Sequence, residues 1–162
     1  MNKKYLLFLY SFFIFLIDQV VKYLINLYKP SIIVIKNVFF VTYEKNTGVA
    51  FSMLSDNKIL IIIISIILLS IFLYIIYKDI IINKDNNKLK YISYILLLGG
   101  ILGNLFDRII RGYVIDFISI KIFGYYFPVF NIADICITVS VIMLIIYMLF
   151  IENREKNKKN MI

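Results

Sequence analysis

Residues 59–77 read ILIIIISIILLSIFLYIIY, nineteen consecutive residues without a charged side chain. As a helix this stretch is about 28 Å long, close to the roughly 30 Å thickness of the hydrocarbon core of a bilayer. It is too long for an ordinary strand, and its apolar residues show no period that would leave a polar face for water. The stretch therefore predicts a transmembrane helix.

Three more stretches have the length and apolar character of spans, at about 5–25, 91–110 and 130–151. The whole chain is 62% hydrophobic and only 17% charged, whereas soluble domains have about 45–50% apolar and about 25% charged residues. So small a globule could not bury this much apolar surface. We expect a membrane α-helical fold with four spans in one domain, residues 1–162, ending in a basic cytoplasmic tail, 152–162.

The orientation of the spans follows from their flanking charges. Ten Lys and Arg residues lie in the N-terminal tail, the 78–90 loop and the C-terminal tail, against seven on the other side. Cytoplasmic segments carry the excess of positive charge. Both termini and the 78–90 loop are therefore predicted to be cytoplasmic, and the segments 29–58 and 111–128 exoplasmic.

The two exoplasmic segments differ from a plain solvated turn. Residues 31–44 read SIIVIKNVFFVTYE, which is β-branched, aromatic and too short to span the membrane. In 112–128, isoleucines at 118, 120 and 122 alternate with Ser119 and Lys121, and Gly124 offers a turn. We expect a small β-rich cradle between the first two spans and an exoplasmic loop between the last two.

The composition also excludes several kinds of site. The chain has no histidine and one cysteine, Cys136, which excludes His-ligated metals, Ser-His-Asp triads, Cys-His dyads and an intramolecular disulfide. We expect no metal and no cofactor. The net charge of +8 belongs to lysines that flank the spans, and no basic folded domain remains to bind nucleic acid.

Four aspartates lie within or at the ends of apolar segments: Asp18, Asp107, Asp116 and Asp134. A carboxylate at the centre of a membrane helix costs roughly 2.5–3.5 kcal/mol, so such residues need a partner or a purpose. Each of these aspartates also has a possible structural role that needs no function. Asp134 has the position of a first-turn acid behind an Asn131 cap, and Asp116 that of a turn residue after Gly112.

Taken together, Asp116 and Asp134 favour a functional interpretation, because both are expected at the exoplasmic boundary. Two carboxylates in one low-dielectric site cannot both ionise cheaply, so the pair holds one proton. Aspartic proteases use this arrangement, with one carboxylate activating water and the other protonating the leaving amine. Intramembrane aspartates also occur in proton transporters, and a membrane scaffold without activity is the third alternative.

Other polar residues in the apolar segments permit two interpretations each. Gly99 and Gly103 form a G-x-x-x-G pattern that allows close helix packing. Asp107 and Arg108 either pair with each other or with other charges, or Arg108 binds a carbonyl or a headgroup. Asp18 and Lys22 are spaced i,i+4 as a buried pair, unless Lys22 snorkels to the membrane surface. The Asn46-Thr47-Gly48 sequence alone is weak evidence, typical of a hairpin loop.

These residues, in their order and spacing, resemble the five sequence blocks of bacterial lipoprotein signal peptidase (signal peptidase II), a family of intramembrane aspartic peptidases. The blocks extend along nearly the whole chain, from the first span to the fourth. They are Asp18-Gln19-x-x-Lys22, Asn46-Thr47-Gly48-Val49-Ala50-Phe51, Gly99-Gly100-x-x-Gly103-Asn104-x-x-Asp107-Arg108, Gly112-Tyr113-Val114-x-Asp116-Phe117 and Phe130-Asn131-x-Ala133-Asp134.

The resemblance implies an endopeptidase of the bacterial plasma membrane that removes the signal peptide of prolipoproteins immediately before a diacylglyceryl-modified cysteine. It implies Asp116 and Asp134 as the catalytic residues. The remaining roles that it implies fall into two sets: substrate binding by Asn46, Gly48, Asn104, Arg108 and Asn131, and structural support by Asp18, Lys22 and Asp107. The expected partners are lipid-modified prolipoproteins and membrane lipids, and the enzyme is expected to be a monomer.

Overall fold

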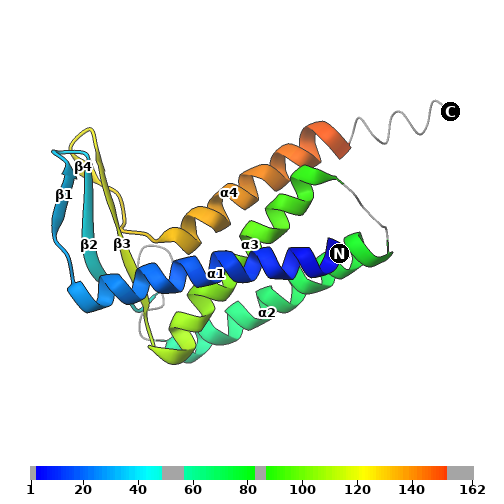
Figure 1. Ribbon diagram of the computed structural model, residues 1–162, viewed down its shortest axis with the longest axis horizontal. Helices are drawn as coiled ribbons and strands as arrows, with labels where there is room; N and C mark the ends of the chain where they lie inside the picture. The colour runs from blue at the N-terminus through cyan, green and yellow to red at the C-terminus, as the bar shows by residue number, and fades with distance from the viewer. Residues whose placement is uncertain (1–2, 49–56, 83–86, 153–162) are drawn as a thin grey trace.

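The computed structural model describes residues 3–48, 57–82 and 87–152. Its helices are α1 (Lys3–Tyr28), α2 (Lys58–Ile76), α3 (Lys88–Ile110) and α4 (Ile132–Ile146), with π-helical turns η2 (Tyr77–Ile82) and η3 (Tyr147–Glu152) extending α2 and α4 (Figure 1). The predicted tail beyond residue 152, and residues 83–86 of the predicted cytoplasmic loop, lie outside the described residues.

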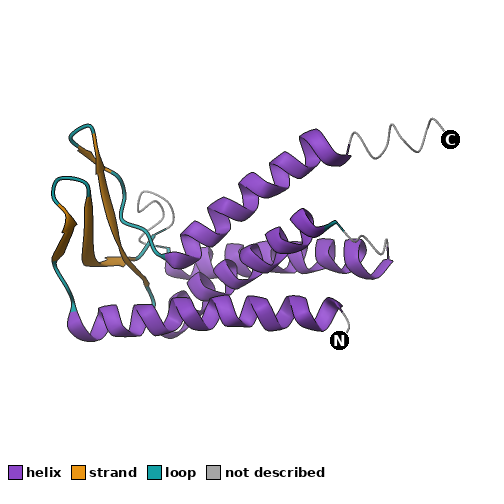
Figure 2. Cartoon of the chain, turned by 45° about the horizontal axis from the view of Figure 1, so that its top comes forward, coloured by secondary structure: helices purple, strands orange, loops and turns teal. Residues whose placement is uncertain are grey.

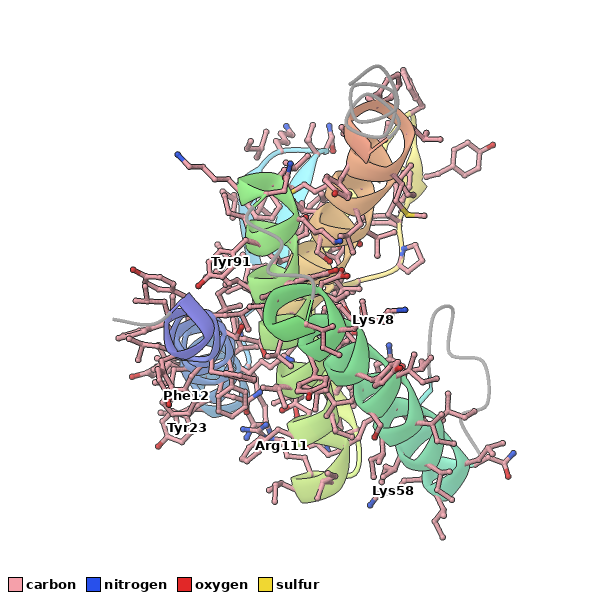
Figure 3. The ribbon with its side chains drawn as sticks, turned by 90° about the vertical axis from the view of Figure 1, so that its right-hand side faces the viewer. Phe12, Tyr23, Lys58, Lys78, Tyr91 and Arg111 are labelled. Carbon is pink, nitrogen blue, oxygen red and sulfur yellow. The ribbon has the colours of Figure 1, made fainter. Side chains whose placement is uncertain are left out.

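The four predicted spans are confirmed, with small shifts at their ends. The helices long and apolar enough to cross a membrane are Tyr5–Tyr28, Lys58–Ile80, Lys88–Ile110 and Ile132–Phe150. Large apolar side chains cover their outer surfaces; Phe12 and Tyr23, for example, are 51% and 60% exposed and point away from the bundle (Figure 3). Lipid is the solvent that these side chains require, because water would make such exposure unfavourable.

Helix α3 is the central helix of the bundle. Half of the residues in its most apolar stretch are buried inside the protein, compared with 17% in the corresponding stretch of each of the other three spans. Its glycines explain the close packing: a Cβ at Gly99 would lie 2.7 Å from Cβ of Ile14 on α1, and one at Gly103 would lie 2.6 Å from Oδ2 of Asp18 on α1 and 3.3 Å from Cβ of Ala133 on α4. The packing interpretation of the G-x-x-x-G pattern is therefore confirmed.

A four-stranded antiparallel sheet lies at one end of the bundle, with its strands running across the helix axes (Figure 2). The strands are β1 (Ile32–Ile35), β2 (Phe39–Asn46), β3 (Val114–Ile122) and β4 (Tyr125–Tyr126), in the order β1-β2-β3-β4. The sheet combines both segments that the sequence predicts to be exoplasmic. The second one is thus more than the loop that the sequence predicts, because β3 pairs with β2 along most of its length.

The register of this pairing places the end of β2, with Asn46, beside the part of β3 that contains Asp116. Asn46 lies opposite Val114, and Glu44 lies opposite Asp116. Strand β3 also pairs with the residue that precedes α4, since Ile118 N–H donates to the carbonyl of Phe130 at 2.8 Å and Phe130 N–H donates back at 3.0 Å. The start of α4 is therefore fixed beside the middle of β3.

Two turn predictions have different outcomes. Gly124 lies in the turn between β3 and β4 at a φ of +87°, a left-handed conformation that favours glycine, so the predicted turn is confirmed. The interpretation of Asp116 as a turn residue is wrong, because Asp116 lies within β3 and is only 3% exposed. The apolar residues on both sides of Asp116 are strand residues.

Candidate active site

Asp134 occupies the first turn of α4, in the position that the capping interpretation predicts. The Asn131 side chain accepts a hydrogen bond from Asp134 N–H at 3.0 Å, and Oδ2 of Asp134 accepts one from Asn131 N–H at 3.1 Å. This reciprocal capping box fixes the carboxyl group at the helix start. Capping uses one carboxylate oxygen and leaves the other, Oδ1, to face α3.

Oδ1 of Asp134 accepts a hydrogen bond of 2.7 Å from Nδ2 of Asn104 on α3. The Asn104 amide is oriented by its other end, because its oxygen accepts from the buried ammonium of Lys22 at 3.0 Å and from Nδ2 of Asn131 at 3.2 Å. Lysine can only donate. The NH₂ group of Asn104 must therefore point at Asp134.

Asp116 projects from β3 into the same region and receives two amide donors. Nδ2 of Asn131 donates to its Oδ1 at 2.6 Å, and Nδ2 of Asn46, at the end of β2, donates to its Oδ2 at 2.9 Å. Burial raises the pKa of Asp116 from an ordinary 3.8 to about 6, and the negative charge of Asp134 adds to the rise. The two amide hydrogen bonds oppose it.

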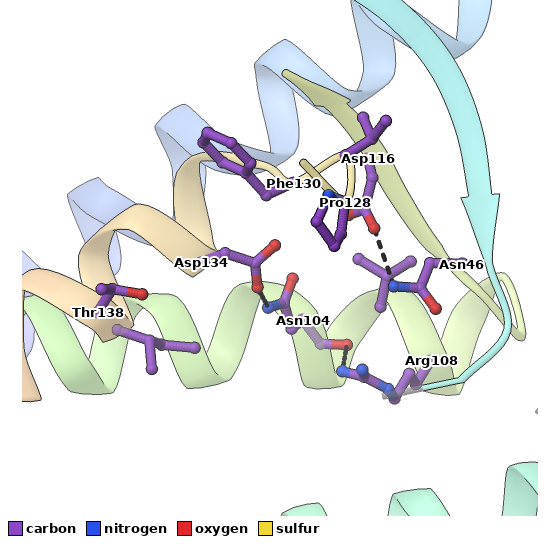
Figure 4. Close-up of a pocket in the computed structure, with 11 residues that line it drawn as sticks. Asn46, Asn104, Arg108, Asp116, Pro128, Phe130, Asp134 and Thr138 are labelled. Atoms are coloured by element: carbon purple, nitrogen blue, oxygen red, sulfur yellow. Dashed lines mark hydrogen bonds between the residues drawn. The ribbon is translucent and has the colours of Figure 1, made fainter. Parts of the chain in front are cut away.

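Both carboxyl groups line one cavity of about 290 Å³ (Figure 4). The cavity is polar where α3 and β3 meet, and apolar along the segment that leads into α4. Its lining residues are Asn46, Asn104, Arg108, Val114, Asp116, Pro128, Val129, Phe130, Asp134, Ile137 and Thr138. A substrate bond in this cavity can meet two carboxyl groups at once, which suits acid–base chemistry.

Arg108 reaches into the cavity from α3. Its terminal nitrogens donate to the backbone oxygens of Asn104 and Gly48, each at 3.2 Å, and its Nε is buried with no hydrogen-bond partner among the described residues. Asp107 and Arg108 do not pair with each other, and the interpretation in which Asp107 pairs with other charges is confirmed. Asp107 pairs instead with Lys22 at 3.0 Å and with Arg111.

A fully buried ion cluster lies beneath the cavity. Lys22 contacts Asp18 at 2.8 Å and Asp107 at 3.0 Å, and all three side chains are 0% exposed. Lys22 is thus a buried partner and does not snorkel to the membrane surface. Asp18 Oδ1 also accepts from Ala133 N–H at 3.0 Å, so the cluster connects α1, α3 and the first turn of α4.

Asn46 and Gly48 form a small turn of their own, in which the Asn46 side-chain oxygen accepts from Gly48 N–H at 3.0 Å. This contact leaves the NH₂ group of Asn46 for Asp116. Residues 49–51, the last part of the Asn46–Phe51 block, lie outside the described residues. Among the residues described, no group of three or more His, Cys, Asp or Glu side chains could hold a metal ion; metal independence stays a prediction.

Comparison with known proteins identifies the family. A family model described as signal peptidase (SPase) II matches residues 10–150. The chain belongs to this family. A lipoprotein signal peptidase of Staphylococcus aureus is 38% identical over 165 residues, covering 98% of this chain and 99% of the relative, and that of strain JH9 matches equally well.

Two solved structures, each described as a bacterial membrane enzyme, have the same architecture. One, determined at 2.3 Å resolution, gives a TM-score of 0.79 at 38% identity, over 88% of this chain and 87% of the other. The second, at 1.9 Å, gives a TM-score of 0.78 at 38% identity, over 90% and 93%. The chain is a peptidase of the signal peptidase II family, which rules out the transporter and scaffold alternatives.

Two residues beside the ion cluster, Arg111 and Gln19, have no role predicted from the sequence of this signal peptidase II family member. Arg111 pairs with Asp107, and its Nη1 donates to Oε1 of Gln19 at 2.9 Å. Nε2 of Gln19 donates to Oδ1 of Asp107 at 3.2 Å. The i,i+4 spacing of Asp107 and Arg111 was a usable signal, since residues at this spacing are neighbours on a helix. Gln19 had no comparable signal outside its sequence block.

Proposed function

We propose that this signal peptidase II family member is an aspartic endopeptidase whose catalytic residues are Asp116 and Asp134. The observation that carries the proposal is the convergence of these two carboxyl groups, from β3 and α4, on one cavity. They are joined through Asn131, whose side chain donates to Asp116 and whose backbone N–H donates to Asp134, and the Asn104 side chain also donates to Asp134. Family membership supplies the activity, cleavage of signal peptides from prolipoproteins.

The mechanism follows from the unequal surroundings of the two carboxyl groups. Burial raises the pKa of Asp116 to about 6, and Asp116 is therefore proposed to hold the single proton that the pair shares. Asp134, as carboxylate, takes a proton from a water molecule that attacks the scissile carbonyl carbon. Asp116 gives its proton to the carbonyl oxygen, which leaves a tetrahedral carbon with two hydroxyl groups. The proton taken up by Asp134 then passes to the leaving amine as the C–N bond breaks, and Asp116 takes a proton back from one hydroxyl group as the C=O bond re-forms.

Arg108, Asn46 and Gly48 are proposed to hold the substrate backbone. The buried Nε of Arg108, which has no partner among the described residues, offers a charge-assisted hydrogen bond to a substrate carbonyl. Asn104 and Asn131 are proposed to orient the two aspartates for substrate. The ion cluster of Asp18, Lys22 and Asp107, described above, is proposed to hold α1, α3 and α4 in register beneath the site.

We propose that cleavage occurs immediately before a diacylglyceryl-modified cysteine. A second cavity, of about 440 Å³, supports this proposal, because it borders the first and includes Asn104, Arg108 and Asp134 in its lining. The rest of its lining is mostly apolar and comes from α2, α3 and α4: Ser65, Leu68, Phe72, Leu97, Ile101, Leu105 and Ile137. Such a surface suits an apolar part of the substrate next to the scissile bond.

Cleavage of synthetic peptides by the purified protein tests this function. A prolipoprotein peptide with a diacylglyceryl-modified cysteine should be cut before that residue, as mass spectrometry of both products would show, and EDTA should not slow the reaction. The same peptide with a free cysteine is the matched control and should be cut much more slowly. Equal cleavage of both peptides, or loss of activity in EDTA that zinc restores, would contradict the proposal.

We further propose that the protein is a monomer in the bacterial plasma membrane, with both termini cytoplasmic and the dyad at the exoplasmic face. The uneven distribution of Lys and Arg supports this orientation. In a Cys136→Ser background, an impermeant thiol reagent should label Lys36→Cys in intact cells, and should label Lys88→Cys only after the membrane is opened. Labelling of Lys88→Cys in intact cells would refute the orientation.

A further inference from the structure

The outer end of the sheet exposes an unusual amount of apolar surface. The hairpin between β3 and β4 exposes Phe123 by 97% and Tyr125 by 79%, and Tyr126 and Phe127 by 62% and 51%. Strand β1, at the opposite edge of the sheet, exposes every one of its residues, Ile32–Ile35, by at least half. Monomeric proteins in water seldom expose contiguous apolar surface of this kind without a partner for it.

The turn of this hairpin has a bulky residue, Phe123, in a backbone conformation that such residues rarely adopt. Phe123 has a φ of +49° and Gly124 one of +87°, and Ile122 pairs with Tyr125 across them. Two-residue turns with two positive φ angles favour Asn-Gly, and a bulky residue in this conformation is strained. Turn formation does not explain a phenylalanine here, and its ring is in contact with almost nothing in the protein.

The position of the sheet relative to α1 indicates what contacts these exposed apolar residues. The exposed apolar surface of α1 continues to Leu27 and Tyr28, which are 57% and 73% exposed, and β1 follows after the short segment Lys29-Pro30-Ser31. The Tyr5–Tyr28 span is about 36 Å long at 1.5 Å per residue, longer than the roughly 30 Å hydrocarbon core. Its end therefore lies at the level of the lipid headgroups, and the sheet begins there.

The turns of the sheet have the composition of a membrane interface. Residues 32–41 and 118–128 contain no acidic residue and one lysine each, Lys36 and Lys121. The ammonium of Lys121 lies 4.7 Å from the centre of the Tyr126 ring, so cation and aromatic ring form one amphipathic unit. Tyrosines gather at membrane interfaces, and lysines are attracted to anionic lipid headgroups.

We propose that the hairpin between β3 and β4, at the outer end of the sheet, inserts into the bilayer leaflet next to it. Phe123 and Tyr125 then lie among the upper parts of the acyl chains. The anchored hairpin and Asp116 share strand β3, so lipid contact at one end of the strand sets the depth of the carboxyl group at the other. This inference concerns the membrane placement of the sheet and goes beyond the proposed peptidase activity. Figures 1 and 2 show this end of the sheet projecting past the start of α4.

The absence of tryptophan from the chain allows a direct test. Phe123→Trp would carry a single tryptophan, whose emission is excited selectively over that of the tyrosines, in bilayer nanodiscs that contain phosphatidylglycerol and lipids brominated high on the acyl chain. Phe13→Trp, on the lipid-facing side of α1 where Phe13 is 54% exposed, is the lipid reference. Glu44→Trp, at an exposed position of β2, is the water reference in the same sheet.

Insertion predicts strong quenching of Phe123→Trp by brominated lipid, close to that of Phe13→Trp, and weak quenching by aqueous iodide. Quenching by iodide as in Glu44→Trp, with little effect of bromine, would overturn the proposal. Protection from both quenchers that disappears on dilution would also overturn it, because a second copy of the chain would then cover the hairpin. Tyr125→Trp carries the same expectation and serves if Phe123→Trp does not fold. Fluorescence needs no substrate, so the result is separate from the test of peptidase activity.

Discussion

Replacing Asn46 with alanine should move the pH dependence of cleavage in a predictable direction. The Asn46 amide donates a 2.9 Å hydrogen bond to Asp116 and thereby holds the pKa of that carboxyl group down against burial. A hydrogen bond to a charged group contributes about 1.5–3 kcal/mol, and one pKa unit corresponds to about 1.36 kcal/mol. Loss of the bond should raise the pKa of Asp116 from about 6 by about one to two units.

The proposed mechanism needs one proton on the pair, so activity falls as pH rises through the pKa of Asp116. The alkaline limb of kcat/KM, which reports the free enzyme, should therefore move to higher pH in Asn46→Ala by the same one to two units. In the wild type, the alkaline limb of kcat should lie at a higher pH than the alkaline limb of kcat/KM, because bound substrate buries Asp116 further and so raises its pKa. A lower maximal rate in Asn46→Ala is compatible with both expectations, since only the pH at which the alkaline limb falls reports protonation.

The assay is the rate of cleavage of a diacylglyceryl-cysteine peptide in detergent, measured across the pH range. Asn26→Ala is the matched control, because the Asn26 amide oxygen accepts a hydrogen bond of the same 2.9 Å length from the Tyr43 hydroxyl, outside the cavity. It should leave the limb unmoved. An unmoved limb in Asn46→Ala, or one that moves to lower pH, would refute the assignment of the shared proton to Asp116.

Three further substitutions test the surroundings of the dyad. Arg108→Lys keeps the charge but loses Nε, so kcat/KM should fall about ten- to hundredfold, the effect of one charge-assisted hydrogen bond; a wild-type value would show that only the charge matters. Lys22→Met leaves two buried carboxylates without their shared partner and should lower the free energy of unfolding by about 3–5 kcal/mol, and an unchanged melting temperature in detergent would argue against a structural role. Gly100→Ala places a methyl group 2.6 Å from the carbonyl oxygen of Ala133, so α3 and α4 must separate at a cost of about 1–3 kcal/mol; unchanged stability would contradict this packing.

The spans were predictable because the membrane acts on each helix separately. A run such as 59–77 must be apolar over the whole hydrocarbon thickness, whatever its neighbours are. The sheet was only partly predictable. Alternation and β-branching indicated strands near 31–44 and 118–122, but nothing local to either segment shows that β2 pairs with β3, about 75 residues later in the chain, in one particular register.

The two aspartates of the cavity were predictable because ionisable groups in apolar surroundings need a purpose. Their partners were not, since the donors of Asp116 come from β2 and from the residue that caps α4. Asp107 shows how sequence adjacency misleads. Arg108 follows it directly, but successive residues on a helix point in different directions, and the actual partner on α3 is Arg111, one turn later.

The central claim is that Asp116 and Asp134 act as one catalytic unit, and turnover of three variants tests it most directly. Asp116→Asn and Asp134→Asn should each lower kcat by on the order of 10²–10⁴-fold, since an amide can neither give nor accept the required proton. The double variant should be little worse than either single one, and all three should keep the wild-type melting temperature and bind the peptide. Near-wild-type turnover in either single variant, or losses that multiply in the double variant, would contradict the account.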